Sequence, residues 1–187
     1  MRRQILSWSD VDALMEHLLP QFYGSFGALL MIARGGIIPG GLIAERLNLR
    51  YLLTAAVRFP ADPPPESISP LGHLAPPSLT PETRSLKPEL RSMPDFILFP
   101  PDAALRGRRT LVVQHVWNHG RTINTVAGRV VAADGSPELC VLHYKPANSI
   151  FPDLKPDYYA AITDDYIVYP WEVSHHLETY RPMLELA

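Results

Sequence analysis

Continuous apolar runs alternate with amphipathic stretches along most of the chain. Such runs are typical of strands buried on both faces of a parallel sheet, and the amphipathic stretches are typical of the helices that cover it. The expected strands cover residues 28–33, 51–57, 96–99, 110–116, 138–144, 158–162 and 166–169. Strands that alternate with helices predict an α/β fold, with a mostly parallel sheet flanked by helices.

The first helix is expected near the N-terminus. Ser9 followed by Asp12 is typical of a helix N-terminus, where such side chains accept hydrogen bonds from the first backbone N–H groups. Apolar residues then recur at helical spacing, at Val11, Leu14, Met15, Leu18 and Leu19. Pro20 should end this helix, because proline lacks the N–H that a helix interior needs.

Two further helices each follow a turn that contains glycine. One covers 38–47, so that residues 28–57 form a strand–helix–strand unit. The other begins after Gly120, has its apolar positions on one face, and ends near Asp134. Each of these helices therefore comes directly after a buried strand.

Composition and charge limit the classes of protein. The chain has 187 residues, of which 47% are hydrophobic and 19% charged, values typical of one globular domain. The net charge of −2 gives no basic field for nucleic acid or an anionic membrane. No signal peptide follows Arg2 and Arg3, and no apolar run is long enough to span a bilayer. We therefore expect a cytoplasmic protein with neither nucleic acid nor membrane as partner, and Cys140 as a reduced core residue.

Residues 60–101 hold 12 of the 20 prolines, which predicts a long loop over 60–95. Two interpretations are open. The loop could be a mobile cover over a binding site, stiffened by polyproline conformation. It could equally be an insertion without a function.

Two strand-to-helix turns have the composition of phosphate sites. Ala33-Arg34-Gly35-Gly36 follows strand 28–33, and Asn118-His119-Gly120-Arg121-Thr122 follows strand 110–116. Glycine lets the backbone approach a ligand, and the first turn of a helix offers unpaired N–H groups and a partial positive charge. Either turn alone is compatible with an ordinary connection. Together they predict a ligand that carries phosphates at two ends.

These turns resemble those of the phosphoribosyltransferase superfamily, specifically its purine-salvage branch typified by xanthine–guanine phosphoribosyltransferase. The family's signature is a buried strand, two acidic residues and a loop that ends Asp-Thr-Gly-x-Thr. Gly120 and Thr122 match this loop, and Arg121 fills its variable position. Arg34-Gly35-Gly36 resembles the pyrophosphate loop, in which relatives commonly have a cis peptide that would here join Ala33 to Arg34. The resemblance extends from about Phe26 to Glu172.

The resemblance implies two groups of site residues, one that binds phosphoribosyl pyrophosphate and one that binds the base. Those that would bind phosphoribosyl pyrophosphate are Ala33, Arg34, Gly35, Gly36, Gln114, His115, Asn118, His119, Gly120, Arg121 and Thr122. The base would be held downstream. There, by analogy with relatives, Lys145 would bond the 6-oxo oxygen, Tyr166 would stack on the ring, and the Ile167 carbonyl would meet the base edge.

Three acidic positions of the family are occupied by other residues here. Gln114 and His115 replace the two carboxylates that bond the ribose hydroxyls and help to locate Mg²⁺, and Asn118 replaces a candidate acid/base. Amide and imidazole groups are poor ligands for Mg²⁺, so we expect no metal-ligating residue. Mg²⁺ is still the cofactor expected with phosphoribosyl pyrophosphate, and it would be held by pyrophosphate and ribose oxygens with water. Asn118 can bond the base nitrogen N7 without exchanging a proton, which leaves His119 and Arg34 as the other candidate catalytic residues.

Other functional residues have a structural alternative. Lys145 could be a solvated strand end, and Tyr166 a core or interface aromatic. Trp117 is expected to pack over the sheet edge rather than to stack on a ligand. His175-His176 is expected on the surface.

We therefore expect one phosphoribosyltransferase-like domain over 1–187, with a core at about 26–145 and a small hood from 1–25 and 146–187. The leading function is transfer of a 5-phosphoribosyl group from phosphoribosyl pyrophosphate to a purine-type base, by a homodimer. One alternative is a non-catalytic module that binds nucleotide or phosphoribosyl pyrophosphate. Another is a hydrolase or a different sugar-phosphate enzyme on the same scaffold. The sequence does not identify the base.

Overall fold

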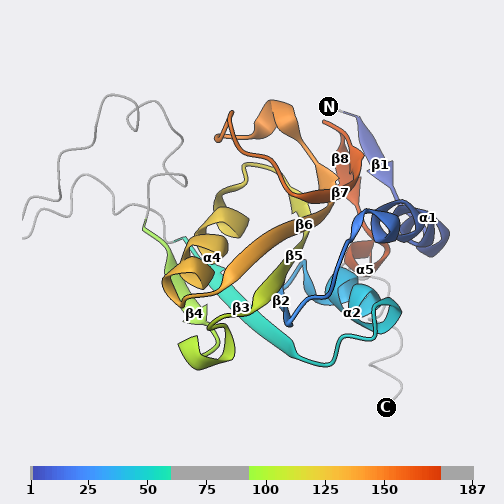
Figure 1. Cartoon of the computed structure of the whole chain (residues 1–187). Helices are drawn as coiled ribbons and strands as arrows, with labels where there is room; N and C mark the ends of the chain where they lie inside the picture. The colour runs from blue at the N-terminus through green and yellow to red at the C-terminus, as the bar shows by residue number, and fades with distance from the viewer. Residues whose placement is uncertain (1, 60–92, 174–187) are drawn as a thin grey trace, which may run out of the picture.

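The computed structural model describes residues 2–59 and 93–173. Its main feature is a sheet with strand order β4-β3-β2-β5-β6-β7, parallel throughout except that β4 runs antiparallel to β3 (Figure 1). The strands are β2 (Ala28–Ile32), β3 (Leu52–Arg58), β4 (Asp95–Leu98), β5 (Arg109–Trp117), β6 (Ser136–Tyr144) and β7 (Tyr158–Ile162). This arrangement confirms the predicted α/β fold.

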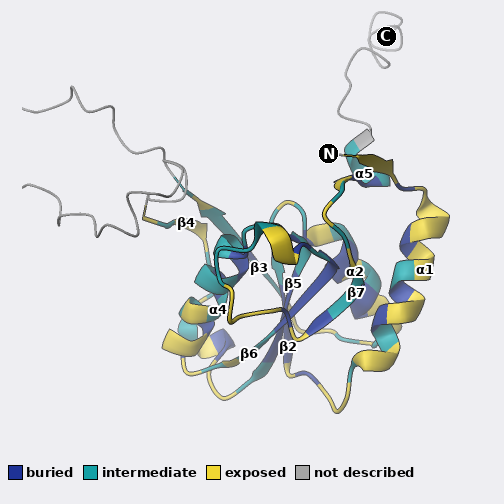
Figure 2. Ribbon diagram, turned by 90° about the horizontal axis from the view of Figure 1, so that it is seen from above, coloured by how far each residue is buried: buried dark blue, intermediate teal, exposed yellow. Residues whose placement is uncertain are grey.

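Helices cover both faces of the sheet (Figures 1 and 2). The α1 (Trp8–Leu18) and α2 (Ile37–Arg46) helices pack on one hydrophobic cluster, and α4 (Arg121–Ala132) packs on the other. The apolar stripe of α4 consists of Ile123, Val126 and Val130, which are all fully buried. Short 3₁₀ helices lie at Leu19–Gln21, Asp102–Ala104 and Pro146–Asn148.

The α1 helix begins two residues before the predicted start. Its N-cap is Ser7, whose hydroxyl accepts a hydrogen bond from Asp10 N–H (3.2 Å), while Asp10 Oδ2 accepts one from Ser7 N–H (2.7 Å). Ser9 and Asp12 are therefore not the capping pair. The Asp12 carboxylate instead forms an ion pair with Arg46 at 2.7 Å. The helix ends before Pro20, as predicted.

A second, two-stranded sheet joins the two ends of the described chain. In it β1 (Arg3–Ile5) runs parallel to β8 (Tyr166–Val168), which is followed by α5 (Pro170–Val173). The ring of Trp8 lies 5.8 Å from that of Trp171, so the start of α1 contacts α5 as well. This small sheet lies where the hood was expected. The domain limits remain a prediction, because 60–92 and 174–187 lie outside the described residues.

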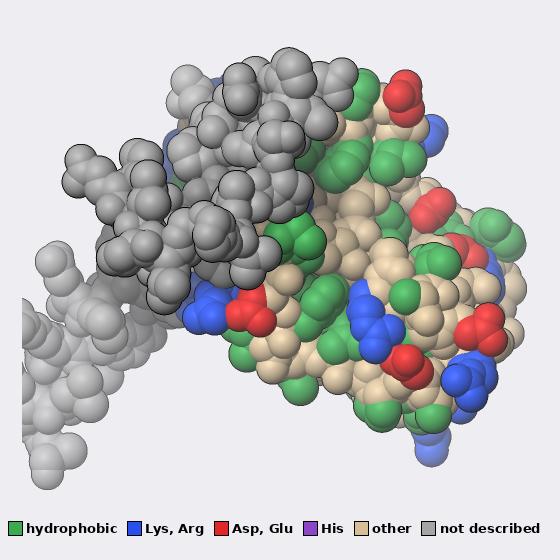
Figure 3. Space-filling model, turned by 90° about the vertical axis from the view of Figure 1, so that its left-hand side faces the viewer, with side chains coloured by type: hydrophobic (Ala, Val, Ile, Leu, Met, Phe, Trp, Pro, Cys, Tyr) green, Lys and Arg blue, Asp and Glu red, His purple; other side chains and the backbone are tan. Residues whose placement is uncertain are grey.

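Charges of both signs are mixed on the surface. Figure 3 shows one face on which Lys and Arg side chains lie among Asp and Glu. Two ion pairs of 2.6 Å join Arg58 to Asp95 and Arg129 to Asp102. No helix within the described ranges is long and apolar enough to cross a bilayer.

Two predictions concern residues that the structure does not describe, and a third concerns Cys140, which it does describe. The proline-rich loop lies almost entirely outside the described residues, as do His175 and His176. The prediction that Cys140 is a core residue is confirmed, since its side chain is buried and burial raises the pKa of its thiol.

Candidate functional site

Strand register brings the two glycine-containing turns together. Met31 of β2 lies beside Val113 of β5, so both strands end at the same edge of the sheet. A Cβ atom on Gly36 would lie only 2.2 Å from the Val113 carbonyl oxygen, and one on Gly35 would lie 1.9 Å from His115 Nδ1. The turn after β2 therefore rests directly on the end of β5, at a distance that only glycine permits.

The turn after β2 has the backbone expected of it. The peptide bond between Ala33 and Arg34 is cis, which confirms that prediction. Gly36 is the N-cap of α2, and the Arg34 side chain is exposed to solvent. The Gly36 N–H donates to the Ile32 carbonyl and the Ile37 N–H to the Arg34 carbonyl, so the exposed Arg34 guanidinium is the clearest donor that this turn presents.

The turn after β5 is supported by a buried indole. Gly120 has φ of +77°, and a Cβ atom on it would lie 2.4 Å from Trp117 Cε2. Trp117 itself is 0% exposed, and its Nε1–H donates to Ser149 Oγ (3.1 Å). The indole is therefore part of the core beneath the turn, and no face of it is open for stacking on a ligand.

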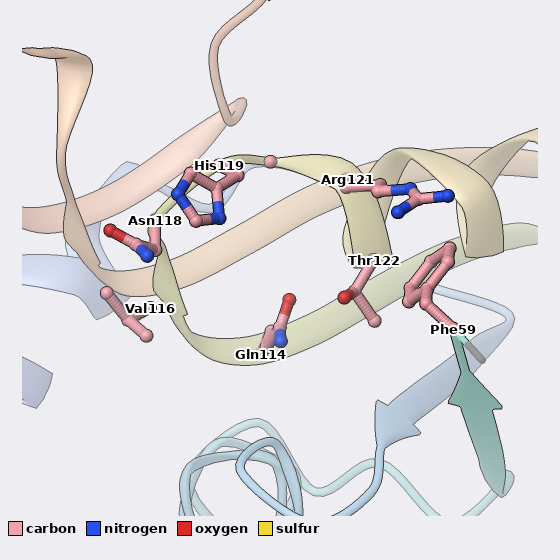
Figure 4. Close-up of a pocket in the computed structure, with 8 residues that line it drawn as sticks. Phe59, Gln114, Val116, Asn118, His119, Arg121 and Thr122 are labelled. Atoms are coloured by element: carbon pink, nitrogen blue, oxygen red, sulfur yellow. The ribbon is translucent and has the colours of Figure 1, made fainter. Parts of the chain in front are cut away.

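A cavity of about 350 Å³, here called the α4 cavity, opens at the N-terminus of α4 (Figure 4). Its lining residues are Phe59, Gln114, Val116, Asn118, His119, Gly120, Arg121 and Thr122. Figure 4 shows the side chains of Gln114 and Thr122 in the same space, with Arg121 beside Phe59. The Arg121 guanidinium lies 4.0 Å from the centre of the Phe59 ring. The start of a helix, a hydroxyl and a guanidinium lie together here, which is the chemistry that suits an anion.

A second cavity of about 450 Å³, here called the hood cavity, adjoins the first. Its lining residues are His115, Val116, Asn118, His119, Lys145, Asn148, Tyr166, Ile167, Tyr169 and Glu172. Val116, Asn118 and His119 line both cavities, which are therefore adjacent. Volumes in this range suit small-molecule ligands. All three residues expected to hold a base, Lys145, Tyr166 and Ile167, line the hood cavity.

Lys145 is a buried cation rather than a solvated strand end. It is 5% exposed, and its Nζ donates to the Asp165 carbonyl oxygen at 2.5 Å. Burial lowers the pKa of its ammonium, and the nearby Asp164 and Asp165 oppose that shift. Tyr166, by contrast, is 55% exposed, so it is not a core aromatic. Its ring is free to meet a ligand in the hood cavity.

His115 has one nitrogen buried and one directed toward a carboxylate. Its Nδ1 is buried and has no hydrogen-bond partner among the described residues, while its Nε2 lies 3.6 Å from Glu172 Oε1. Burial lowers the pKa of His115, and Glu172 acts in the opposite direction. The lowered pKa favours a neutral imidazole at pH 7.

Sequence reasoning missed two contributors to the site. Glu172 was not among the residues expected to bind a ligand, yet among the described lining residues it is the one carboxylate of the two cavities. Its Oε2 accepts a hydrogen bond from Tyr169 N–H at 3.0 Å. Asn148 donates from Nδ2 to Asn118 Oδ1 at 2.8 Å, which fixes the Asn118 amide. The position of Glu172, just after the segment expected to hold a base, was the only available signal.

The donor set at the end of β5 does not fit Mg²⁺. Gln114, His115 and Asn118 supply amides and an imidazole, whereas Mg²⁺ prefers carboxylate and water oxygens. Within residues 2–59 and 93–173, no group of three or more His, Cys, Asp or Glu residues is placed to hold a metal ion. His115 and His119 thus have no third ligand of those types in the described chain.

No family model and no curated protein sequence matches this chain. Solved structures do. The purine phosphoribosyltransferase from Pyrococcus horikoshii Ot3 is 22% identical, with a TM-score of 0.65, over 92% of this chain and 95% of that one. The chain has the phosphoribosyltransferase fold. The resemblance drawn from the sequence is therefore confirmed at the level of the fold.

Two further structures share this phosphoribosyltransferase fold over nearly their whole length. Helicobacter pylori xanthine-guanine-hypoxanthine phosphoribosyltransferase is 16% identical with a TM-score of 0.66, over 97% of this chain and 99% of that one. A hypothetical protein from Neisseria gonorrhoeae with bound ppGpp is 16% identical with a TM-score of 0.69, over 99% and 97%.

Proposed function

We propose that this protein transfers a 5-phosphoribosyl group from phosphoribosyl pyrophosphate to a purine-type base and releases pyrophosphate. The observation that carries the proposal is that the α4 and hood cavities lie side by side and share Val116, Asn118 and His119. One cavity has the chemistry of an anion site. The other has a buried cation and an exposed aromatic ring. A phosphorylated sugar in the first would meet a base in the second.

The α4 cavity would bind the 5′-phosphate and the ribose. The N–H groups of residues 119–122 and the Thr122 hydroxyl suit phosphate oxygens, because the start of a helix carries unpaired donors and partial positive charge. Gln114 would bond a ribose hydroxyl. The leaving pyrophosphate would lie against Arg34 and the backbone of Gly35 and Gly36, where a guanidinium can donate two parallel hydrogen bonds.

The hood cavity would bind the base. Lys145 would donate to an oxo oxygen, Tyr166 would cover the ring, and the Ile167 carbonyl would accept from the base edge. Asn118 Oδ1 already accepts from Asn148, so the Asn118 N–H groups remain available for an acceptor nitrogen such as N7.

The proposed reaction replaces one bond at the anomeric carbon with another. The bond from C1′ to the pyrophosphate oxygen breaks with its electron pair on pyrophosphate, and a base nitrogen forms the new bond to C1′. The N–H proton of the base must leave, and we assign its acceptance to the imidazole of His119, which lines both cavities. Fixed donors around the leaving group and exclusion of water would lower the barrier.

A mass-spectrometric assay tests the proposal directly. The purified protein is incubated with phosphoribosyl pyrophosphate, Mg²⁺ and a pool of nucleobases. A new nucleotide and an equal amount of pyrophosphate are expected, and the mass of the nucleotide identifies the base. Pyrophosphate without a nucleotide would show a hydrolase instead. If neither product forms, the transferase proposal is wrong.

Lys145 should decide how tightly a purine nucleotide is bound. A hydrogen bond from a charged donor is worth about 1.5–3 kcal/mol, so Lys145→Gln should weaken binding of GMP or IMP by roughly ten- to a hundredfold. Isothermal titration calorimetry measures the loss. Lys155→Gln is the matched control, since that lysine is exposed and lies outside both cavities. Equal losses in the two variants would remove Lys145 from the base site.

The second candidate function is a non-catalytic nucleotide-binding module. Two observations favour it, namely the lack of carboxylates at the end of β5 and the likeness to a structure that holds ppGpp. Such a module would bind GMP or ppGpp to saturation and form no product.

Restoring the acidic positions separates the two functions. The triple variant Gln114→Asp, His115→Asp, Asn118→Asp should raise the transferase rate at least tenfold in the presence of Mg²⁺, because it supplies the oxygen ligands that the β5 end lacks. The rate of nucleotide formation measures this. If the triple variant still binds nucleotide but stays inactive, the binding module is the better description.

A further inference from the structure

A third cavity lies outside the candidate site, between α1, β1 and the edge strand β7, which stand side by side in Figure 1. We call it the α1 cavity. Its volume of about 390 Å³ matches those of the other two. Its lining residues are Gln4, Leu6, Asp10, Ala13, Leu14, His17, His143, Ala160, Ala161, Ile162 and Thr163. None of these residues lines the α4 or the hood cavity.

The space arises from small side chains on facing elements. The α1 residues that line it recur at helical spacing, at positions 10, 13, 14 and 17, and form a face distinct from the buried Val11, Met15 and Leu18. Ala13 on this face and Ala160 and Ala161 of β7 all line the cavity, and their small side chains leave it open. Leu6, Leu14 and Ile162 give the cavity apolar walls.

His143 is the most unusual residue of the α1 cavity, because it is only 3% exposed. Its Nδ1 lies 2.8 Å from the Tyr169 hydroxyl oxygen, and that hydroxyl donates to the His115 carbonyl oxygen at 2.8 Å. A hydroxyl has one hydrogen, so His143 Nδ1 must carry the proton of their shared bond. Burial, followed by the charge of Lys145, lowers the pKa of His143 to about 4, and the ring is neutral at pH 7.

The polar atoms left for a ligand are mostly acceptors. In the neutral tautomer His143 Nε2 is an acceptor, and the described residues donate no hydrogen bond to it. His17 Nδ1 is 2.8 Å from the Ala13 carbonyl, so its Nε2 is also an acceptor when the ring is neutral. Asp10 adds its Oδ1, since its Oδ2 already accepts from Ser7, and Gln4 and Thr163 can both donate and accept. No Lys or Arg of the described chain lines this cavity, which makes it unsuited to phosphates.

We propose that the α1 cavity is a second small-molecule site, for a planar heterocycle with N–H donors, the chemistry of a free nucleobase, which donates to His143 Nε2. The apolar walls would cover the ring faces and the acceptors would receive the N–H groups. Tyr169 links this site to the candidate active site, since its hydroxyl joins His143 to the His115 carbonyl and its ring lines the hood cavity. Occupancy of the α1 cavity therefore alters the end of β5 through Tyr169.

The site is tested with adenine and 2-aminobenzimidazole as probes, by calorimetry and by NMR of the His143 side chain. Saturable binding to the wild type is expected. Ala13→Leu should weaken it at least tenfold, because the added side chain fills the cavity from an exposed helix position that tolerates leucine. Glu16→Leu is the matched control on the same helix, outside the cavity, and should bind as the wild type does. Inorganic phosphate should not compete.

Two results would overturn the site. One is no saturable binding at millimolar probe. The other is binding that Lys145→Gln weakens and Ala13→Leu does not, since the probe would then occupy the hood cavity. Neither result bears on phosphoribosyl transfer, which the product assay tests separately.

The link is tested with Tyr169→Phe, which removes only the hydroxyl. Probe binding should weaken, because His143 Nδ1 loses the partner that fixes its tautomer, and at saturating probe the probe-induced shift of the His115 backbone resonances should fall by at least half. An unchanged shift in this variant would overturn the link through the hydroxyl.

Discussion

Trp117→Ala should destabilise the protein by about 3–5 kcal/mol, a large part of the stability of a typical domain. The indole is fully buried in the cluster between the sheet and α4, and it packs edge to face against the Tyr144 ring, with centroids 5.8 Å apart. Removing it leaves a void directly beneath Gly120, against which its ring is packed. Chemical denaturation measures the loss. Nucleotide binding should weaken as well, because the turn that begins α4 loses its support.

Trp117→Phe is the control for this variant. It keeps an aromatic ring in the cluster but loses the hydrogen bond from Nε1 to Ser149 Oγ, a contact worth about 1 kcal/mol. A smaller loss of stability than in Trp117→Ala is therefore expected, with nucleotide binding largely retained. If the alanine variant is as stable as the wild type, Trp117 is not the core residue that the structure shows.

Gly36→Ala should have the second large effect, on ligand binding and on stability together. The added Cβ would lie 2.2 Å from the Val113 carbonyl oxygen and 2.8 Å from that of Ile32, both backbone atoms that cannot move aside. The turn after β2 would have to shift away from β5. We expect at least a tenfold loss of affinity for phosphoribosyl pyrophosphate, measured by calorimetry, and a lower melting temperature.

Gly41→Ala provides the comparison within the same helix. A Cβ there meets no atom within 4 Å, and alanine in a helix interior is favoured over glycine by up to about 1 kcal/mol. This variant should melt at or above the wild-type temperature and bind the ligand normally. If the Gly36 and Gly41 variants bind phosphoribosyl pyrophosphate with equal affinity, the turn after β2 takes no part in binding it.

The local pattern of the sequence was enough to predict the central scaffold. Uninterrupted apolar runs identified strands such as β2 and β5, because strands buried on both faces need apolar residues at every position. The glycine turns were predicted from the points where these apolar runs end, because each turn follows its strand directly. The capping of α1 was placed two residues late, because Ser7 and Ser9 are each followed three residues later by an aspartate and only the backbone decides between them.

Contacts between segments that are distant in the sequence could be identified only from the tertiary structure. Glu172 reaches His115 because β8 and α5 return over the end of β5, a juxtaposition that no spacing in the chain reveals. The same holds for Asn148 on Asn118, which fixes an amide that the sequence left free to turn.

The sequence by itself determined the α/β scaffold and the two glycine turns, because each follows from a short run of residues. The cis peptide between Ala33 and Arg34 was expected only from the resemblance to the family. The tertiary structure decided that Trp117 is core, that Lys145 is buried, and that Tyr169 connects His143 to the β5 end. Burial and hydrogen bonding across the sheet depend on strand order and register. Those are set by the packing of the whole chain, and not by any local pattern within it.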